Sequence, residues 1–207
     1  KLVPAFRQIP LHGKLHDVWD LPEDQAVFND ISEGKTETVF QLNTNSAKQY
    51  LRLFDFVRED GTKGINGIEA VAAFTALDRP GPLDAFVQVP GGKKHNMLVE
   101  YANRAAGKKA VNPLPILQEL LPETYGVIVF QEQIQRIYHK LGKTTAAEAD
   151  EFRAHVGKKY QGYEQYRVKD RDVFMAGATE SAGKEVAESL WEQMGTWAQY
   201  GFNKSHA

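Results

Sequence analysis

The sequence has 207 residues, of which 42% are apolar and 25% are charged, a composition typical of a folded globular protein. It contains no cysteine, which excludes disulfide scaffolds, thiolate zinc sites and cysteine nucleophiles. No apolar stretch approaches the roughly 18 residues that a membrane span needs, and the first residues do not resemble a signal peptide. The sequence therefore predicts a soluble, cytoplasmic protein with no membrane partner.

The net charge of −2 hides an uneven distribution along the chain. Residues 1–90 carry 9 basic and 13 acidic side chains, residues 91–160 carry 11 and 7, and residues 161–207 carry 5 and 7. The middle third is therefore cationic. Its lysine pairs at 93–94, 108–109 and 158–159 would attract phosphate if they converge in space, whereas on unrelated loops they would be ordinary solvated charges.

The first third of the chain predicts an irregular opening followed by helices. Prolines and glycines dominate residues 1–35, which predict a loop with one short helix near residues 23–29. The β-rich residues 36–42 predict a short strand. Helical spacing of apolar residues predicts a helix over residues 47–57, and a capping box of Asn66 and Glu69 opens a second that runs to Leu77. Arg79-Pro80-Gly81-Pro82 predicts a rigid turn, in which the glycine takes a conformation closed to other residues.

The rest of the chain predicts further helices. Residues 126–130 predict a strand or the buried start of a helix. Two of the helices have clear signals: strict apolar spacing over residues 130–141, and a capping box of Thr145 and Glu148 that opens a helix reaching Val156. The other expected helices lie over residues 97–106, 115–121, 160–178 and 184–199. The predicted fold class is mainly α, with a few short strands.

No motif in the sequence predicts a metal site. His12 and His16 are four residues apart, but Pro10 and Gly13 make that stretch a poor helix. Asp170 and Asp172 lie in a predicted helix, where residues two apart diverge by about 200° and do not chelate one ion together. The phosphate-binding, dinucleotide-binding and nucleophile-elbow glycine motifs are absent.

Several groups suited to phosphate stand beside glycines. Arg79 precedes the Pro-Gly-Pro sequence, and Arg153 precedes Gly157-Lys158-Lys159. The chain ends with Gly201-Phe202-Asn203-Lys204-Ser205-His206. A triphosphate is bound by fork donors, point cations and backbone amides, which these segments supply if they converge.

At these residues the chain resembles the fingers region of the alpha subunit of bacterial replicative DNA polymerase III, in family C of the DNA polymerases. The similar segments occur in the family's order: Thr38-Val-Phe-Gln-Leu42, Arg79-Pro-Gly-Pro-Leu-Asp84, Glu123-Thr-Tyr-Gly-Val-Ile-Val-Phe-Gln-Glu-Gln133, Glu148-Ala-Asp150, Gly157-Lys-Lys159 and Gln199-Tyr-Gly-Phe-Asn-Lys-Ser-His-Ala207. The strings Arg-Pro-Gly-Pro and Phe-Asn-Lys-Ser-His are specific individually, and residues 1–30 are the least similar.

The resemblance implies part of a DNA-directed DNA polymerase, a nucleotidyltransferase of DNA replication. It implies that residues 36–207 form a helical fingers domain and residues 1–35 a connection from the palm. The catalytic aspartates of the family lie in that palm, whose Pro-Asp-x-Asp motif is absent here, so the chain is expected to be a fragment that is inactive alone. Mg²⁺ is expected only in the complete polymerase. The implied partners are template-primer DNA, a deoxynucleoside triphosphate (dNTP) and the palm of the same or a companion chain.

The resemblance assigns nucleotide binding to residues of both motifs and of the cationic segment. They are Arg79, Arg153, Lys158, Lys159, Asn203, Lys204 and His206. The family usually has two adjacent arginines before Gly-Lys-Lys, whereas here Ala154 and His155 follow Arg153. This departure indicates a divergent branch, bacterial or viral, and weaker triphosphate binding or a larger role for Lys158 and Lys159.

Two expectations follow for the structure. Arg79, Arg153, Lys204 and His206 are expected on one concave face, and their mutual repulsion is expected to leave residues 201–207 mobile. The alternative function is a stand-alone, non-catalytic helical module that binds nucleic acid or protein. A palm domain encoded directly upstream of this sequence would favour the polymerase function, and the absence of such a palm would favour the stand-alone module.

Overall fold

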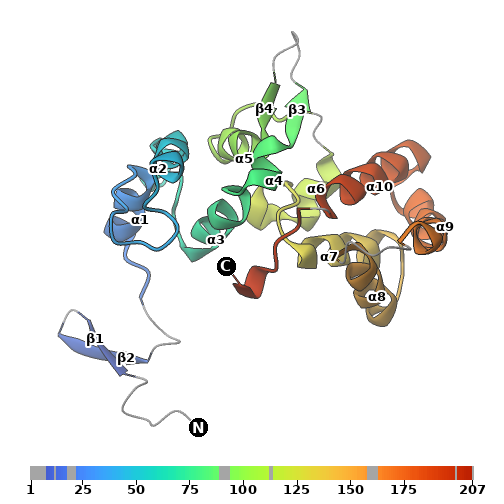
Figure 1. The fold of residues 1–207 in the computed structure, drawn as a ribbon, viewed down its shortest axis with the longest axis horizontal. Coiled ribbons are helices and arrows are strands. Elements are labelled where there is room, and N and C mark those ends of the chain that lie inside the picture. The colour runs from blue at the N-terminus through green and yellow to red at the C-terminus, as the bar shows by residue number, and fades with distance from the viewer. Residues whose placement is uncertain are drawn as a thin grey trace.

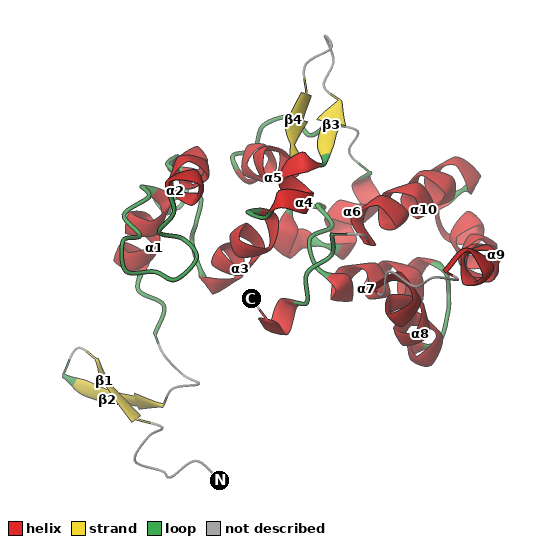
Figure 2. Cartoon of the chain, in the orientation of Figure 1, coloured by secondary structure: helices red, strands yellow, loops and turns green. Residues whose placement is uncertain are grey.

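Helices dominate the computed structural model, which describes residues 8–11, 13–17, 22–88, 94–111, 114–157, 163–198 and 200–206 (Figure 1, Figure 2). Within these residues, strands form two short antiparallel hairpins. The predicted mainly α class with a few short strands is confirmed. The elements of the first half are β1 (Gln8–Leu11), β2 (Lys14–Asp17), α1 (Gln25–Ser32), α2 (Asn45–Leu51), the 3₁₀ helix η2 (Arg52–Phe54), α3 (Ile68–Leu77), α4 (Pro80–Asp84), β3 (Phe86–Gln88), β4 (Lys94–Asn96) and α5 (Met97–Ala105). Those of the second half are α6 (Pro115–Leu120), η3 (Pro122–Thr124), α7 (Gln131–Leu141), α8 (Ala146–Gly157), α9 (Tyr163–Ala182), α10 (Lys184–Ala198) and η4 (Lys204–His206).

The first described segment is a β-hairpin. β1 and β2 pair antiparallel, with Pro10 opposite Leu15, and Gly13 takes a φ of +75° at the turn. The prediction of an irregular segment is therefore wrong for residues 8–17. The prolines and glycines of this segment predicted a loop, but a two-stranded ribbon has only edge strands, where proline is tolerated.

The stretch predicted as a strand at residues 36–42 is a series of turns. The Thr36 hydroxyl donates to the carbonyl of Leu42, and Gln41 takes a left-handed φ of 65°. Leu42 is buried by this arrangement. The β-prone composition misled the prediction because local turns, and not a partner strand, satisfy these backbone groups.

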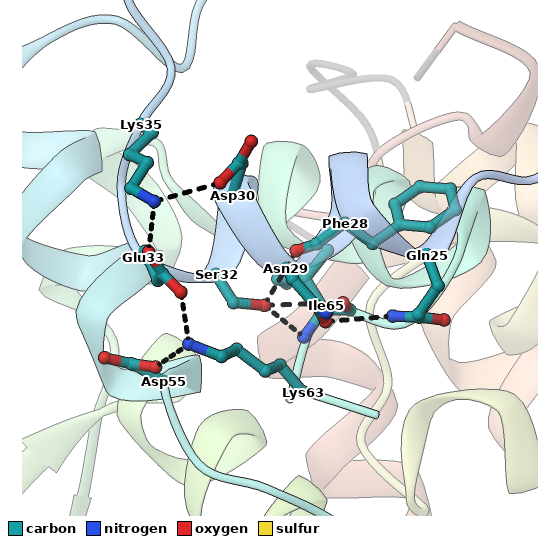
Figure 3. A network of polar contacts seen from close by, with 10 residues as sticks. All are labelled: Gln25, Phe28, Asn29, Asp30, Ser32, Glu33, Lys35, Asp55, Lys63 and Ile65. Atoms are coloured by element: carbon teal, nitrogen blue, oxygen red, sulfur yellow. Dashed lines mark hydrogen bonds and ion pairs between the residues drawn. The ribbon is translucent and has the colours of Figure 1, made fainter. Parts of the chain in front are cut away.

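A network of polar contacts fastens the end of α1 to the loop before α3 (Figure 3). The buried Ser32 hydroxyl donates to the Phe28 carbonyl and accepts from the Ile65 N–H at 3.0 Å. Glu33 lies between Lys35 and Lys63, with 2.6 Å to each ammonium. Hydrogen bonds from these two lysines lower the pKa of Glu33 to about 2.

The start of α3 is capped from outside its own sequence. Gly67 occupies the N-cap position, and the Ile68 N–H donates to a Glu23 carboxylate oxygen at 3.2 Å. The predicted capping box of Asn66 and Glu69 is therefore wrong. A distant carboxylate satisfies the free N–H, and Glu69 is left for another partner.

The Arg79-Pro-Gly-Pro sequence begins a short helix, and the predicted rigid turn is wrong. Arg79 is extended, with φ −142° and ψ 155°, and Pro80 is the first helical residue of α4. Proline is favoured at that position because its fixed φ suits the helix, and because an N–H in the first turn would have no acceptor within the helix.

A second hairpin, which the sequence pattern did not predict, precedes α5. β3 and β4 pair with Phe86 opposite Asn96. The Asn96 side chain caps α5 by accepting from the Val99 N–H at 3.0 Å and donates to the Tyr50 hydroxyl. The helices predicted at residues 97–106 and 115–121 are confirmed as α5 and α6.

Helices α7 to α10 form a bundle around a cluster of aromatic rings. Tyr138 on α7 stacks on Phe152 of α8, with centroids 4.1 Å apart, and on Phe174 of α9 at 5.7 Å. Trp191 of α10 contacts both phenylalanines. The Thr145 and Glu148 capping box is confirmed. The helix predicted over residues 160–178 continues to Ala182.

Candidate functional site

The end of the chain returns to the start of α7. The Gln131 N–H donates to the Phe202 carbonyl at 2.9 Å, and the Phe202 N–H donates to the Val129 carbonyl at 3.4 Å. Phe130 and Phe202 thus form an isolated parallel bridge, so residues 126–130 reach α7 neither as a sheet strand nor as a helix start. In Figure 1 this C-terminal segment (residues 200–206) passes from α10 beside α4 and the start of α7 toward α3.

Arg79 links the Pro-Gly-Pro helix to the C-terminal segment. Its Nε donates to the Ala76 carbonyl at 2.8 Å, and its Nη2 donates to the Tyr200 carbonyl at 2.7 Å. The guanidinium lies 4.5 Å from the centroid of the Phe202 ring. Burial lowers the pKa of the Arg79 guanidinium, which still stays cationic at neutral pH. Because both described acceptors are neutral carbonyls, the positive charge remains available to an anion.

Gly81 allows Tyr200 to approach α4. A Cβ added to Gly81 would lie 2.3 Å from Cδ1 of the Tyr200 ring. Gly81 is helical and does not take a positive φ. The prediction that Gly81 is needed for an unusual backbone conformation is therefore wrong. Glycine is needed here because any side chain would occupy the space of the Tyr200 ring.

Two carboxylates supply the counter-charge of the C-terminal segment. The Lys204 ammonium lies 2.6 Å from Glu69 of α3, and its backbone N–H donates to the Glu132 carboxylate of α7. Sequence reasoning missed both carboxylates, and nothing near Lys204 in the chain indicates them. The ion pair with Glu69 offsets the positive charge of Lys204, whereas the expected mobility of residues 201–207 stays a prediction.

The other two predicted residues of the segment shape its last turn. The Asn203 side chain accepts from the Ser205 N–H at 3.0 Å and from the Ser205 hydroxyl. The backbone carbonyl of Asn203 accepts from the His206 N–H. The His206 ring lies 5.5 Å from that of Phe202. Asn203 thereby fixes the 3₁₀ turn that carries Lys204 and His206.

A pocket of about 460 Å³ lies between α2, α3, α4 and the C-terminal segment. Arg79 and His206 both line it. The other polar lining side chains are Gln41, Thr44, Ser46, Thr75 and Asp78. Apolar walls come from Leu42, Pro80, Leu83 and Phe202. The structure thus brings together two predicted site residues that are 127 positions apart in the chain, and we call this cavity the Arg79 pocket.

Arg153 lies on α8 and contacts its own helix. Its Nε and Nη2 donate to Asp150 at 3.0 and 2.9 Å. No contact among the described residues joins Arg153 to Arg79 or to the C-terminal segment, so their convergence stays a prediction. Lys158 and Lys159 lie outside the described residues.

His155, which follows Ala154, lies against α9. Its Nδ1 is 2.9 Å from Asp170, and its ring stacks on Tyr166 at 4.6 Å. Asp170 and Asp172 lie in α9, and Asp170 is engaged by this histidine.

The described residues do not fit a resident metal ion. No group of three or more His, Asp or Glu side chains among them is placed to bind one. In the described part of the chain, no helix is both long and apolar enough to cross a bilayer.

Comparison with known proteins identifies the family of the chain. The fold is mainly helical, and Arg79 at its Arg-Pro-Gly-Pro helix start contacts the C-terminal segment. The chain belongs to the family described as the bacterial DNA polymerase III alpha subunit finger domain, which matches residues 5–181.

Curated relatives support the same family. The chain is 35% identical over 199 residues to DNA polymerase III subunit alpha of Aquifex aeolicus, which covers 95% of this chain and 15% of the relative. It is 33% identical to the Chlamydia trachomatis protein and 35% identical to the Mycobacterium tuberculosis protein of the same name, each over 89% of this chain. The chain thus spans 13–15% of the length of these relatives.

Proposed function

We propose that this chain positions the incoming dNTP and the template-primer in a DNA-directed DNA polymerase, while a palm outside the chain supplies the metal-binding aspartates. One observation carries the proposal: Arg79 and the C-terminal segment, which both belong to the motifs on which the resemblance rests, meet at one pocket. In the complete enzyme, the primer 3′-hydroxyl would attack the α-phosphate as the bond to the β-phosphate breaks and pyrophosphate leaves, with the charge stabilisation of Mg²⁺ supplied at the palm outside this chain. The role of this chain is positioning and charge neutralisation.

Arg79 is suited to contact a phosphate. Its two described hydrogen bonds fix the guanidinium plane through Nε and Nη2 and leave Nη1 without a described acceptor. A guanidinium that is already oriented loses little conformational entropy when it binds an anion. Arg79 thus supplies an oriented Nη1 donor at the wall of the pocket.

Lys204 is suited to a second contact. Its ion pair with Glu69 is solvent-accessible, and such pairs contribute little to stability. The Lys204 ammonium can therefore leave Glu69 and bind a phosphate with little loss of stability. Arg153, Lys158 and Lys159 complete the proposed set if closure of the domain brings α8 toward the pocket.

The test is equilibrium binding of dATP to the 207-residue chain, measured by calorimetry at low and high salt. Lys204→Gln should weaken binding about tenfold, the effect of losing one charge-assisted hydrogen bond. Lys143→Gln is the matched control, because Lys143 also pairs with an exposed glutamate, Glu180, at 2.7 Å but lies between α7 and α8 and not in the C-terminal segment. Equal losses in both variants would show diffuse charge attraction. Binding of DNA but not of dATP would favour the non-catalytic module.

A further inference from the structure

Asp78 is a carboxylate of the Arg79 pocket that has no partner among the described residues. It is the C-cap residue of α3, directly before Arg79, and it lines the pocket. Its side chain makes no hydrogen bond or ion pair with any described residue. Burial raises the pKa of Asp78, and no neighbouring cation offsets that effect.

This position is unfavourable for a negative charge in the free protein. The last carbonyls of a helix carry partial negative charge, which repels a carboxylate at the C-cap. Partial burial removes water from the carboxylate without an ion pair in return. A residue that lowers fold stability and faces a pocket is typical of a binding site.

The other lining groups limit what Asp78 can recognise. Among the described residues that line the pocket, Asp78 is the one carboxylate, and Arg79 lies next to it in the chain. The Thr75 hydroxyl already donates to the Val71 carbonyl, and the Thr44 hydroxyl caps α2. A fitting ligand therefore presents a hydrogen-bond donor to Asp78 and an anionic group to Arg79, as a nucleotide does.

We propose that Asp78 accepts a hydrogen bond from the 3′-hydroxyl of the bound nucleotide, whose phosphates face Arg79 and the C-terminal segment. This inference rests on the proposed function. A carboxylate against the base edge would favour some bases over others, because their donor patterns differ. The sugar hydroxyl is common to all four dNTPs, so this contact serves a polymerase whose template selects the base.

The experiment compares dATP with 2′,3′-dideoxy-ATP, which lacks the 3′-hydroxyl, by calorimetry on the 207-residue chain. The unaltered chain should bind dATP about tenfold more tightly, since hydrogen bonds to charged groups are the stronger class. Asp78→Ala should bind both nucleotides equally. Asp84→Ala is the charge-matched control, because Asp84 is exposed at the end of α4 and does not line the pocket, and it should keep the preference.

Thermal unfolding without nucleotide gives a second readout. Asp78→Asn should raise the melting temperature at neutral pH, because it removes an unpaired charge from the end of α3. A lower melting temperature would show that the carboxylate has a partner within the fold and would overturn the inference. Equal binding of the two nucleotides by the unaltered chain, or a preference kept by Asp78→Ala, would overturn the inference alone. Absence of binding by either nucleotide would overturn the proposed function and this inference with it.

Discussion

Adding a methyl group at Gly81 should disturb the contact between α4 and the C-terminal segment. The new Cβ in Gly81→Ala would lie 2.3 Å from Cδ1 and 2.8 Å from Cε1 of Tyr200. The optimum for two carbon atoms is about 3.5–4.0 Å, so the ring must move by more than about 1 Å. Because the Tyr200 carbonyl accepts the Nη2 hydrogen bond of Arg79, this movement also strains the link between Arg79 and the segment.

The expected cost is about 1–2 kcal/mol of unfolding free energy. Overpacking costs about 1–3 kcal/mol, and alanine in a helix recovers about 0.5–1 kcal/mol relative to glycine. Urea unfolding measures the change. Gly195→Ala in α10 is the control, because a Cβ there meets nothing within 4 Å, and it should stabilise the chain by about 0.5–1 kcal/mol.

Two further measurements identify the cause. Hydrogen exchange at the Gln131 and Phe202 amides, which tie the segment to α7, should accelerate in Gly81→Ala. In a Tyr200→Ala background the same substitution should cost nothing, because the clashing ring is gone. Unchanged stability together with unchanged exchange of these amides would refute the reasoning.

Three other outcomes are expected. Gly177→Ala should lower the unfolding free energy by about 3 kcal/mol in urea unfolding, since its Cβ would lie 2.0 Å from the Gly142 carbonyl oxygen, a backbone atom that cannot change rotamer. A neutral effect would contradict the close approach of α9 to Gly142 at the end of α7. The folded pKa of Glu33, about 2, is below its ordinary value of 4.5, so its contribution to stability is complete above pH 4.5 and is lost as the pH falls toward 2. The difference in melting temperature between the unaltered chain and Glu33→Gln should shrink over that range, and a constant difference would rule out the ion pairs with Lys35 and Lys63 as its cause. The purified chain should show no primer extension with Mg²⁺ and labelled dNTPs, and incorporation would overturn the assignment of the catalytic aspartates to a palm outside it.

Local patterns predicted the second half of the chain well. The apolar spacing over residues 130–141 and the Thr145 capping box depend only on neighbours within one or two turns, and both are confirmed. One error arose where a distant group acts. Glu23, 45 residues away, caps α3 in place of a local box. The error at residues 36–42 has a local cause, because the Thr36 hydroxyl bonds the Leu42 carbonyl in a series of turns and no partner strand is involved.

The sequence by itself determined the helical class, the family and the two motifs that form the pocket. Those properties follow from residue type and short spacing, which need no knowledge of distant contacts. Only the tertiary structure decided that Arg79 bonds the Tyr200 carbonyl, that Glu69 neutralises Lys204, and that Asp78 has no partner among the described residues. These contacts join positions remote in the chain, and the packing of α3, α4 and the C-terminal segment sets them, because burial and charge pairing depend on what surrounds a side chain in space.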